Sequence, residues 1–341
     1  MLSGERHPLP AKTRQHHVAR TCGLSVATVS RALAGDASIS EATRRKVREA
    51  SRKLRYRKTR AGAARITLVA VQRSSASILV PDDLFGIALA RAAANPRMDL
   101  MLRLVQAPGD AAILEAVHTI ADESDGLLLY GFVNRAILQS LSDRHIRHVV
   151  IGNPVDGIQN LPANCVVVTS DMVEMGRVAT ARLIDKGFRR IAFLCHNRTP
   201  GMYNDSWLMG YQLAHVRAGL PMDSELQYII AERERTLAAT PGAAPWPLES
   251  PPDAWVLPNL AVLPGVRKWA QQQNWRLDPG NTVLGGRHSS FVVQFVTEWP
   301  MVAEDSEAMV DAACSIMTML LSGQGQAAAQ IMIPYKLCEG G

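Results

Sequence analysis

Short apolar runs alternate with amphipathic stretches along most of the chain, from residue 66 onward. Apolar runs of four to six residues that are partly β-branched are typical of buried strands. They predict strands at residues 66–71, 100–105, 126–130, 148–152 and 191–195. Apolar positions at helical spacing predict helices at residues 83–94, 110–121, 134–143 and 171–186, the last ending at Gly187. Strand, helix and strand in this order specify a parallel sheet with crossover helices.

A second set of elements of the same kind follows. The same two patterns predict helices at residues 205–218, 260–273 and 305–321, and strands at 226–230, 254–257, 282–285 and 330–334. A segment rich in proline and glycine, residues 236–252, is expected to be a loop. Two similar α/β halves predict a two-lobed body over residues 66–341, with lobe one at about 66–197 and lobe two at about 198–330. Such halves usually bind small molecules at the carboxyl ends of their strands.

The residues before 66 follow a different, purely helical pattern. Gly23 permits a tight left-handed turn after a first amphipathic helix that ends near Val18 and Ala19, and Ser25 is a candidate N-cap for a second helix. This spacing predicts a small all-helical helix-turn-helix domain. The segments of this region are a flexible extension at residues 1–11, the helix-turn-helix domain at 12–57 and a short linker at 58–65.

The second helix of this domain has an inner and an outer face. Val29 and Leu33 lie four residues apart and are expected to face the core. The outer face, at the start of a recognition helix, is the part that meets base edges in the major groove. Its candidate DNA-contacting residues are Ser25, Val26, Ala27, Thr28, Ser30 and Arg31. Three of them have an alternative role, since Val26 could belong to the core, Arg31 could be a solvated surface charge and Ser25 could serve only as the cap.

A third helix is expected to begin at Ser40, whose hydroxyl can cap it. Its apolar positions are Val47, Ala50 and Leu54. Its basic side chains are expected to stay outside and bind phosphates. These are Arg44, Arg45, Lys46, Arg48, Arg52 and Lys53.

The net charge of +6 is unevenly distributed over the chain. Residues 1–65 hold 16 Lys and Arg against 4 Asp and Glu, a net of +12, whereas residues 66–341 hold 21 against 27, a net of −6. A strongly basic segment on an acidic body indicates a head that binds a polyanion.

Several other functions find no support in the chain. We expect no membrane span and no secretory signal, and therefore a cytoplasmic, nucleoid-associated protein. The five cysteines are scattered without CxxC or CxxH spacing, so buried free thiols are expected and no metal site or cofactor. The motifs GxGxxG, GxxxxGK[ST], GxSxG and HExxH are absent, which argues against an enzyme.

The helical head resembles the LacI/GalR family of bacterial transcription repressors. The residues that carry the resemblance are Val18-Ala19, Gly23-Leu24-Ser25, Thr28-Val29-Ser30-Arg31, the run from Ser40 to Val47 and Leu54-Arg55-Tyr56. Further matches in the body are Asp171 with Gly176, the run from Gly187 to Phe193, Gly210-Tyr211 and Pro252-Asp253-Ala254. The resemblance implies an α/β fold with a helix-turn-helix domain followed by a two-lobed parallel-sheet body like that of periplasmic binding proteins.

By this resemblance the protein would bind a near-palindromic operator as a homodimer, or as a tetramer. Arg31 can donate two hydrogen bonds to guanine, and Thr28 and Ser30 can reach phosphate or base. Val26 and Ala27 offer only apolar contacts, such as a thymine methyl. Beyond the second helix, Tyr56, Arg57 and Arg60 are further candidate DNA contacts.

The linker departs from the family pattern. Family members typically place a leucine there that wedges into the minor groove, and residues 56–65 contain none. Two alternatives follow: Ala63, Ala64 and Arg65 approach the minor groove, where arginine reads its width, or the linker is flexible and binds phosphates.

The effector cleft departs from the pattern of sugar-binding relatives as well. Candidate effector-binding residues are Asp171, Arg198, Trp207, Asn259 and Arg287. Arg287 stands where an acid is usual, which favours an anion such as a sugar acid or a phosphorylated metabolite. The alternatives are that Trp207 simply packs in the hinge region, that Arg287 and His288 are surface loop residues, and that Asp171 caps its helix.

The sequence therefore favours a sequence-specific transcriptional regulator, a repressor of a sugar or sugar-acid catabolic operon that senses a small metabolite. Ligand binding would bias two states of the dimer. One alternative is a solute-binding protein of the same two-lobed fold. Others are an activator and a family regulator that has lost its effector response.

Overall fold

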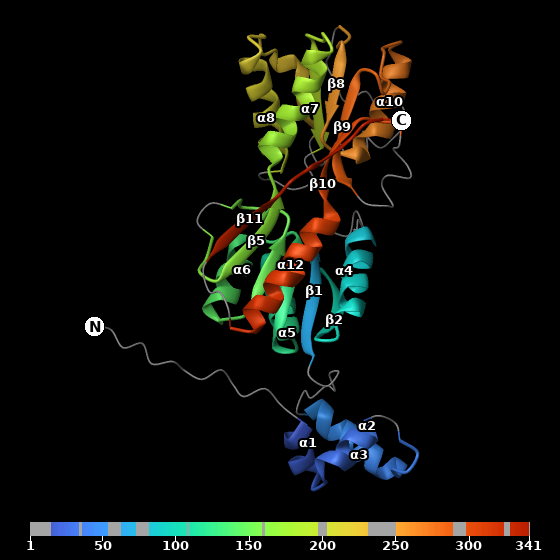
Figure 1. Ribbon diagram of the computed structural model, residues 1–341, viewed down its shortest axis with the longest axis vertical. Helices are drawn as coiled ribbons and strands as arrows, with labels where there is room; N and C mark the ends of the chain where they lie inside the picture. The colour runs from blue at the N-terminus through green and yellow to red at the C-terminus, as the bar shows by residue number, and fades with distance from the viewer. Residues whose placement is uncertain are drawn as a thin grey trace, which may run out of the picture. The chain divides into compact units, whose positions relative to one another are not determined.

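The computed structural model divides into two compact units, residues 1–64 and residues 65–341. We describe residues 15–33, 36–53, 63–72, 82–107, 109–158, 161–196, 203–230, 250–288, 298–323 and 328–340. The first unit is a helical head and the second is a body of two sheets flanked by helices (Figure 1).

The head consists of three helices: α1 (Gln15–Cys22), α2 (Val26–Leu33) and α3 (Glu41–Lys53). The turn between α1 and α2 contains Gly23 at φ 62°, a left-handed conformation that costs glycine little. One side of each helix supplies a small apolar core, as the spacing of apolar positions predicts. The core residues are Val18, Ala19, Cys22, Val29, Ala32, Val47 and Ala50. Leu54, predicted to join them, lies outside the described residues.

The first sheet of the body has six strands in the order β11-β5-β4-β3-β1-β2. The strands are β1 (Ala64–Gln72), β2 (Met98–Gln106), β3 (Gly126–Gly131), β4 (His148–Ile151), β5 (Cys165–Ser170) and β11 (Ala329–Ile333). The pairs from β11 through β5, β4 and β3 to β1 are parallel. This confirms the parallel sheet that the sequence predicts.

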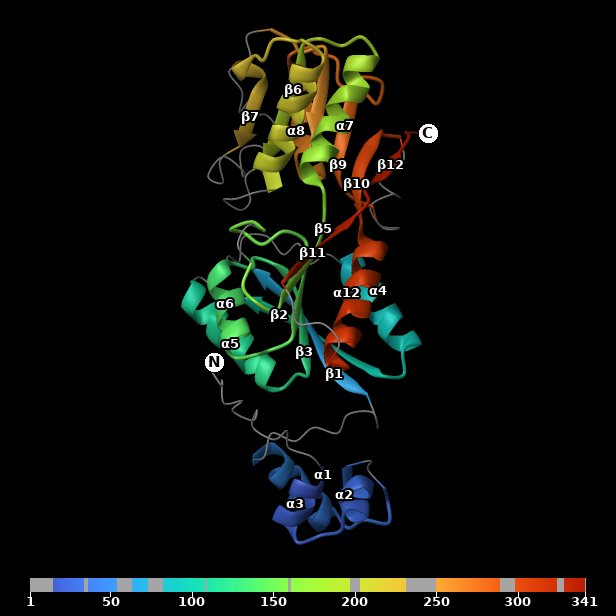
Figure 2. The same cartoon turned by 60° about the vertical axis from the view of Figure 1, so that its left-hand side comes forward.

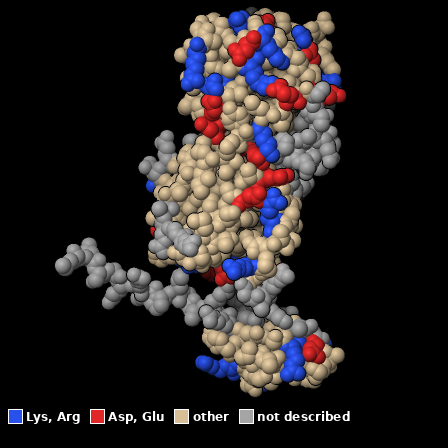
Figure 3. Space-filling model, in the orientation of Figure 1, with Lys and Arg blue, Asp and Glu red and all other residues tan. Residues whose placement is uncertain are grey.

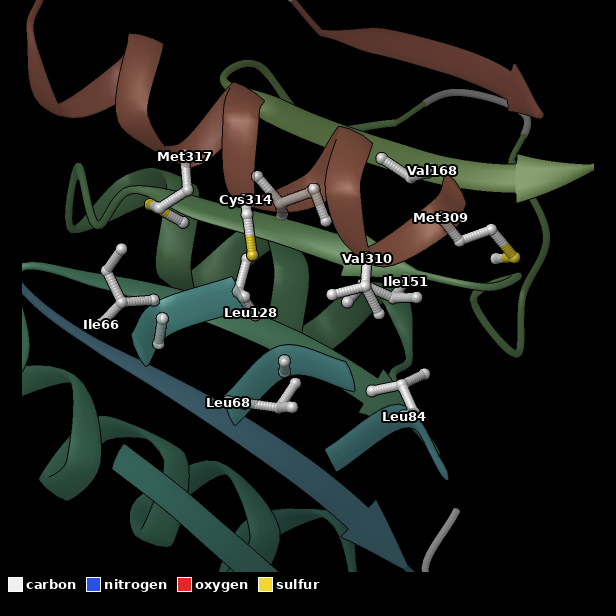
Figure 4. Close-up of a cluster of buried hydrophobic side chains, with 14 of the residues drawn as sticks. Ile66, Leu68, Leu84, Leu128, Ile151, Val168, Met309, Val310, Cys314 and Met317 are labelled. Atoms are coloured by element: carbon white, nitrogen blue, oxygen red, sulfur yellow. The ribbon is translucent and has the colours of Figure 1, made fainter. Parts of the chain in front are cut away.

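Two layers of helices cover this sheet. On one face, α4 (Asp82–Ala94) and α12 (Ser306–Leu321) bury Leu84, Val310 and Met317 against Leu68 and Leu128 (Figure 4). On the other face, α5 (Asp110–Asp122) and α6 (Arg135–Asp143) pack against the alternate side chains of the same strands. The apolar runs are therefore continuous because both faces of the strands are buried.

The second sheet has the order β12-β10-β9-β8-β6-β7. Its strands are β6 (Ile191–His196), β7 (Gln227–Ile230), β8 (Ala254–Leu257), β9 (Thr282–His288), β10 (Met301–Asp305) and β12 (Lys336–Cys338). Only β12 is antiparallel among the described pairs of this sheet. Its helices are α7 (Met172–Asp185), α8 (Tyr203–Arg217) and α10 (Leu263–Gln272), and its 3-10 turns are η1 (Ser224–Leu226) and η3 (Leu260–Val262).

The two lobes are interleaved along the chain, in contrast to the consecutive lobes that the sequence suggests. The chain passes from the first sheet to the second after Ser170, and β6 already belongs to the second sheet. It returns after Asp305 into α12, which lies beside α4 (Figures 1 and 2). It crosses a third time between β11 and β12. Strands pair with partners that are distant in the chain, and this pairing leaves fewer open strand edges. Strand pairing, and not sequence order, therefore decides which lobe a segment joins.

Three strands were not among those predicted from the sequence: β5, β10 and β12. The strand β5 is fully buried and rich in valine, so its sequence carries a strand signal that could have been read. The other two are less regular, because β10 ends in Glu304 and Asp305 and β12 has three residues. The remaining predicted elements agree with the structure to within a few residues at their ends.

Across the described part of the chain, none of the helices combines the length and the apolar character that a membrane span requires. Four cysteines are buried and Cys338 is partly exposed, and all five are free thiols.

Candidate nucleic-acid interface and effector site

The start of α2 is fixed by a capping interaction. The Thr28 backbone N–H donates to the Ser25 hydroxyl at 3.0 Å, and the two hydroxyl oxygens lie 2.8 Å apart. A hydroxyl at this position satisfies one of the four helix-end N–H groups that have no partner within the helix. Ser25 therefore caps α2, and its side chain remains exposed.

The two faces of α2 separate as the sequence predicts. Val29 and Ala32 are buried, at 0% and 3% exposure, whereas Val26 is 45% exposed. Val26 is thus a surface residue and not part of the core. Ala27 and Arg31 are also exposed, and Thr28 and Ser30 are half-buried. The face presents one guanidinium among small side chains, which suits insertion into a major groove.

An acid that the sequence analysis did not single out lies just beyond α2. The Asp36 carboxylate accepts the backbone N–H of Ser38 at 2.9 Å and its hydroxyl at 2.8 Å. These bonds, first the one from the backbone, hold the pKa of Asp36 below its usual value, and the charges of Arg31 and Arg44 act in the same direction. The Asp-x-Ser spacing of an Asx-turn is the signal that could have revealed it.

The helix α3 is capped in the same manner as α2. The Thr43 backbone N–H donates to the Ser40 hydroxyl at 3.3 Å, and the hydroxyls of the two residues are 2.9 Å apart. Ser40 is thus the predicted cap, one residue before the first helical residue, Glu41.

The basic side chains of α3 are not equivalent. The Arg44 guanidinium donates to the Ile39 carbonyl at 3.0 Å and lies 3.4 Å from Glu41, which also pairs with Arg48 at 3.6 Å. Arg45 and Lys46 are exposed. Basic side chains of the head reach the surface in Figure 3. Arg44 therefore bonds to other residues of the head, whereas all six basic side chains were expected to stay outside and bind phosphates. The side chains of Arg52 and Lys53 lie outside the described parts.

The linker prediction is corrected at its last residue. Arg65 is only 8% exposed; its backbone N–H donates to Asp125 at 2.7 Å and its guanidinium to Asp99 at 3.3 Å. Arg65 is therefore part of β1, where its guanidinium is buried and paired with Asp99, and not part of a linker that enters a minor groove. Ala64 also belongs to β1. The candidates Tyr56, Arg57 and Arg60 fall outside the described residues.

The carboxyl ends of the strands in both sheets lie next to the crossovers. The strand β5 ends at Ser170 and leads directly into α7 of the second lobe, and β10 ends at Asp305 and leads into α12 of the first. Since the neighbouring strands run parallel to these two, their carboxyl ends lie on the same edges. These edges are where doubly wound α/β sheets bind ligands.

Asp171, a candidate effector ligand, caps α7 at the first crossover. Its carboxylate accepts the Glu174 backbone N–H at 2.9 Å, and its side chain is exposed. Asp171 therefore acts as the helix cap that the alternative predicts.

The third crossover carries Tyr335. Burial raises the pKa of Tyr335, and the nearby carboxylates of Glu174 and Asp171 raise it further.

Trp207, the second candidate, is fully buried at 0% exposure, in the cluster between α7, α8 and the second sheet. A Cβ built on Gly285 would lie 2.7 Å from Trp207 Cη2 and 2.7 Å from the Cα atom of Pro258. The ring therefore reaches the carboxyl end of β8 and the middle of β9. Its Nε1 is buried and has no hydrogen-bond partner among the residues that the structure describes.

The two other candidates on the second sheet lie close by in the chain. Asn259 is half-buried and directly follows Pro258, and Arg287 is two residues beyond Gly285 in β9. The fold thus brings the Trp207 ring to the chain segments that carry Asn259 and Arg287. The side chain of Arg287 and the whole of Arg198 lie outside the parts that the structure describes.

A buried acid at this edge was missed by the sequence analysis. Glu304 in β10 is 2% exposed and stands beside Arg287 in the register of the parallel pair β9–β10. Glu304 was not placed because the strand β10 was not predicted.

Among the described residues, no group of three or more His, Cys, Asp or Glu could hold a metal ion.

The three-helix head and the two-lobed body together define a class of protein: a helix-turn-helix head joined to a body like that of periplasmic binding proteins. Residues 16–58 match the model of the bacterial regulatory proteins of the lacI family, and residues 180–341 match the periplasmic binding protein-like domain. The head is therefore similar to the bacterial regulatory proteins of the lacI family, and the second half of the body to periplasmic binding protein-like domains.

Similar proteins agree with this assignment. Catabolite control protein A of Priestia megaterium is 25% identical over 214 residues, which cover 61% of this chain and about three fifths (62%) of that relative. Among solved structures, a transcriptional regulator CelR–cellobiose complex has a TM-score of 0.63 at 21% identity, over 96% of this chain and 100% of that one. A lac repressor dimer bound to operator and the anti-inducer ONPF has a TM-score of 0.61 at 15% identity, over 96% and 99%. These solved structures are of regulators, not enzymes.

Proposed function

We propose that this protein is a sequence-specific DNA-binding transcriptional regulator that represses a sugar or sugar-acid catabolic operon. The observation that carries the proposal is the exposed face of α2, where Arg31 projects among the small residues Val26 and Ala27. A helix that exposes an apolar side chain at 45% and a guanidinium on one face, while the other face holds a core, is suited to base reading.

The phosphate contacts come from the remaining basic residues of the head. Arg45 and Lys46 are exposed on α3, and the basic residues Arg57 and Arg60 follow it in the sequence. Such contacts fix register and give salt-dependent affinity without sequence preference. The net of +12 on residues 1–65 supports this role. We place the protein in the cytoplasm, on the nucleoid.

Operator binding requires two heads on a near-palindromic site, because one recognition helix reads only a few base pairs. We propose a homodimer as the binding unit. The lac repressor structure that the fold resembles is of a dimer on operator. Sedimentation of the purified protein separates a dimer from a tetramer.

A small metabolite at the carboxyl edges of the two sheets would modulate this binding. The candidate contacts are Asp171, Arg198, Trp207, Asn259 and Arg287. Arg287 favours an anionic metabolite, such as a sugar acid or a phosphorylated sugar. The buried acid Glu304 stands beside Arg287 in the strand register and repels a ligand that offers only negative charge. Since a carboxylate accepts hydrogen bonds, we propose an anionic effector that also donates a hydrogen bond.

The test is operator selection from a random DNA library with the purified protein at fixed salt, followed by Arg31→Ala and Arg45→Ala. Loss of a bidentate guanine contact lowers specific affinity by about 1–3 kcal/mol and relaxes sequence preference. We expect this of Arg31→Ala. Arg45→Ala should weaken all sequences equally and reduce the salt dependence. Unchanged sequence preference in Arg31→Ala would contradict base reading by α2.

The effector is tested on the same complex with D-gluconate, glucose 6-phosphate and D-glucose. Release by the two anions alone supports the anionic class. Release by D-glucose alone contradicts it.

A further inference from the structure

The outward face of α8, which lies beside α7 (Figure 2), is apolar. Met209 and Val216 are 58% and 62% exposed, and Leu213, between them in the sequence, is half-buried. Spacings of four and three residues place these three side chains in one row along the helix. The opposite face is apolar as well, since Trp207 and Tyr211 are fully buried in the core of the second lobe. A helix with apolar side chains all round is typical of one that is covered on both sides.

This row differs from the exposed apolar residues elsewhere on the surface. Among the described helices, α2, α4 and α12 each expose one large apolar side chain, namely Val26, Leu89 and Met319, whereas α8 exposes two. Just beyond the end of α8, which is followed by Gly219 at φ 64°, Met222 is 51% exposed. Single exposed apolar residues need no explanation, but several together mark an interaction surface.

The spacing of the row fits a second helix with the same pattern. Apolar residues at intervals of four and three form the seam along which two helices pack. A second copy of α8 supplies such a seam, and a two-fold axis then brings the same surface of both copies together. Because Leu213 lies near the middle of the row, an antiparallel pair places Met209 of one copy near Val216 of the other.

The charges at the two ends of α8 favour the antiparallel pair. Asp205 lies in the first turn and Arg217 in the last turn, and both are exposed. In an antiparallel pair the acidic end of one helix meets the basic end of the other, and the helix dipoles also attract. In a parallel pair the like charges would meet and repel. The charge pattern is therefore complementary to itself only when the two helices run in opposite directions.

An antiparallel pair also points the two bodies in opposite directions. The Tyr211 hydroxyl donates to the Ile191 carbonyl at the start of β6, at 2.7 Å, so α8 runs back along β6 and away from the crossovers. The head is attached at the start of β1, the end of the first sheet that is remote from the crossovers. The two points of attachment therefore lie at opposite ends of the pair. Heads attached there do not reach adjacent half-sites of one operator.

We propose that the outward face of α8 is a second interface between copies of this protein, which pairs two α8 helices antiparallel and joins two operator-binding dimers into a tetramer. The operator-binding dimer rests on the proposed function, and the α8 pair is a separate surface. Each half of the tetramer presents its own pair of heads, so one tetramer holds two operator duplexes.

Sedimentation equilibrium of the full-length protein without DNA tests the interface, over about 1–50 μM, where small interfaces associate. We expect wild type to reach the mass of a tetramer, and Met209→Lys and Val216→Lys to stay at half that mass, because each places a charge in the apolar seam. Met319→Lys is the matched control, since Met319 is 51% exposed on α12. It should assemble as wild type does.

The orientation of the pair is tested by charge reversal at low salt. Asp205→Arg and Arg217→Asp should each raise the dissociation constant of the tetramer at least threefold, since each brings like charges together in an antiparallel pair. Protein that carries both substitutions should return to within twofold of wild type. Circular dichroism shows that each variant is folded.

Three results would overturn the inference. The first is a wild-type protein that does not exceed the mass of a dimer at any concentration. The second is a tetramer that persists in both Met209→Lys and Val216→Lys, or one that Met319→Lys abolishes equally. The third is a double charge reversal that associates no better than the single ones, which contradicts the antiparallel pair.

Failure of the proposed function is recognised separately. Fluorescence anisotropy measures the binding of the selected operator to wild type and to Val216→Lys, and the two affinities should agree within twofold, because one dimer suffices for one operator. Loss of operator binding in wild type would contradict the regulator, whereas the masses measured without DNA would still decide the α8 interface.

Discussion

Gly210 of α8 lies against Gly176 of α7 so closely that a Cβ on Gly210 would be 3.0 Å from the Gly176 carbonyl carbon. The same Cβ would be 2.6 Å from the backbone nitrogen of Arg177. The two helices thus meet backbone to backbone, which only residues without side chains permit. This crossing holds α8, and Trp207 with it, against α7.

We expect Gly210→Ala to destabilise the body by about 3 kcal/mol or more, because the added methyl must displace backbone atoms that cannot rotate away. Gly86→Ala is the matched control, since Gly86 is exposed within α4 and a Cβ there meets nothing within 4 Å. It should stabilise by about 0.5–1 kcal/mol through helix propensity. Urea denaturation followed by tryptophan fluorescence measures both. Equal stability of the two variants would contradict the close crossing.

The two caps of the head provide a second comparison. Ser25→Ala and Ser40→Ala each remove a hydroxyl that accepts a backbone N–H, so each should lower the stability of the head by about 1 kcal/mol. Only Ser25 lies on the face proposed to read DNA. Circular dichroism on heating gives the stabilities and anisotropy gives the operator affinities. We expect Ser25→Ala to lose at least threefold more operator affinity than Ser40→Ala. If the two lose the same, the Ser25 hydroxyl acts only as a cap.

Stability should fall with acid between pH 7 and pH 5.5. Burial lowers the pKa of His148, which is 0% exposed, and of His215, which is 2% exposed. Because the folded-state pKa lies below the unfolded value of about 6.5, the unfolded chain binds protons first as the pH drops. The stability is fully present above this value and is lost below it, by up to about 1.4 kcal/mol per pH unit for each histidine.

The measurement is urea denaturation at pH 7.5, 6.5 and 5.5 for wild type and His148→Phe. Phenylalanine removes the titrating ring and also its hydrogen bond with the Ile146 carbonyl, at 2.8 Å. The readout is therefore the change of the free energy of unfolding with pH, and not the absolute stability of the variant. A slope identical to that of wild type would show that His148 does not titrate on unfolding.

Asp305 joins two of the crossovers between the lobes. Its carboxylate accepts the Ala308 N–H at 3.1 Å, which caps α12, and lies 3.0 Å from Lys336 Nζ. We expect Asp305→Ala to cost about 1–3 kcal/mol, and Lys336→Met at most about 1 kcal/mol, since the ion pair is partly exposed. Asp305→Asn retains a capping oxygen and should lie between the two. Denaturation curves that place Lys336→Met below Asp305→Ala would contradict this order.

Local features of the fold were predictable from the sequence. Ser25 and Ser40 each stand one residue before a helix and hydrogen-bond a threonine three residues on, a relationship contained within four consecutive residues. The periodicity that places Val29 inside and Arg31 outside is equally local. Predictions of this kind need no knowledge of distant contacts.

Other features depend on residues far apart in the chain. Arg65 reads as part of a basic linker, but it pairs with Asp99 and Asp125, which lie 34 and 60 residues away. Trp207 reads as an effector contact, and its complete burial follows from three glycines at positions 176, 210 and 285. The assignment of residues 329–333 to the first lobe depends on the pairing of β11 with β5, which no local pattern encodes. For the effector site, the sequence thus identifies candidate residues but not their surroundings.

The pairing of β11 with the first sheet and of β12 with the second has a consequence for biosynthesis. Both edge strands lie within residues 329–338. Each lobe therefore lacks an edge strand until these residues have been synthesised and have left the ribosome. A premature stop shortly before residue 329 would leave two incomplete sheets with open edges, which are prone to aggregate. Both lobes of the body would thus complete their sheets at nearly the same point in synthesis, once residues 329–338 are free to pair.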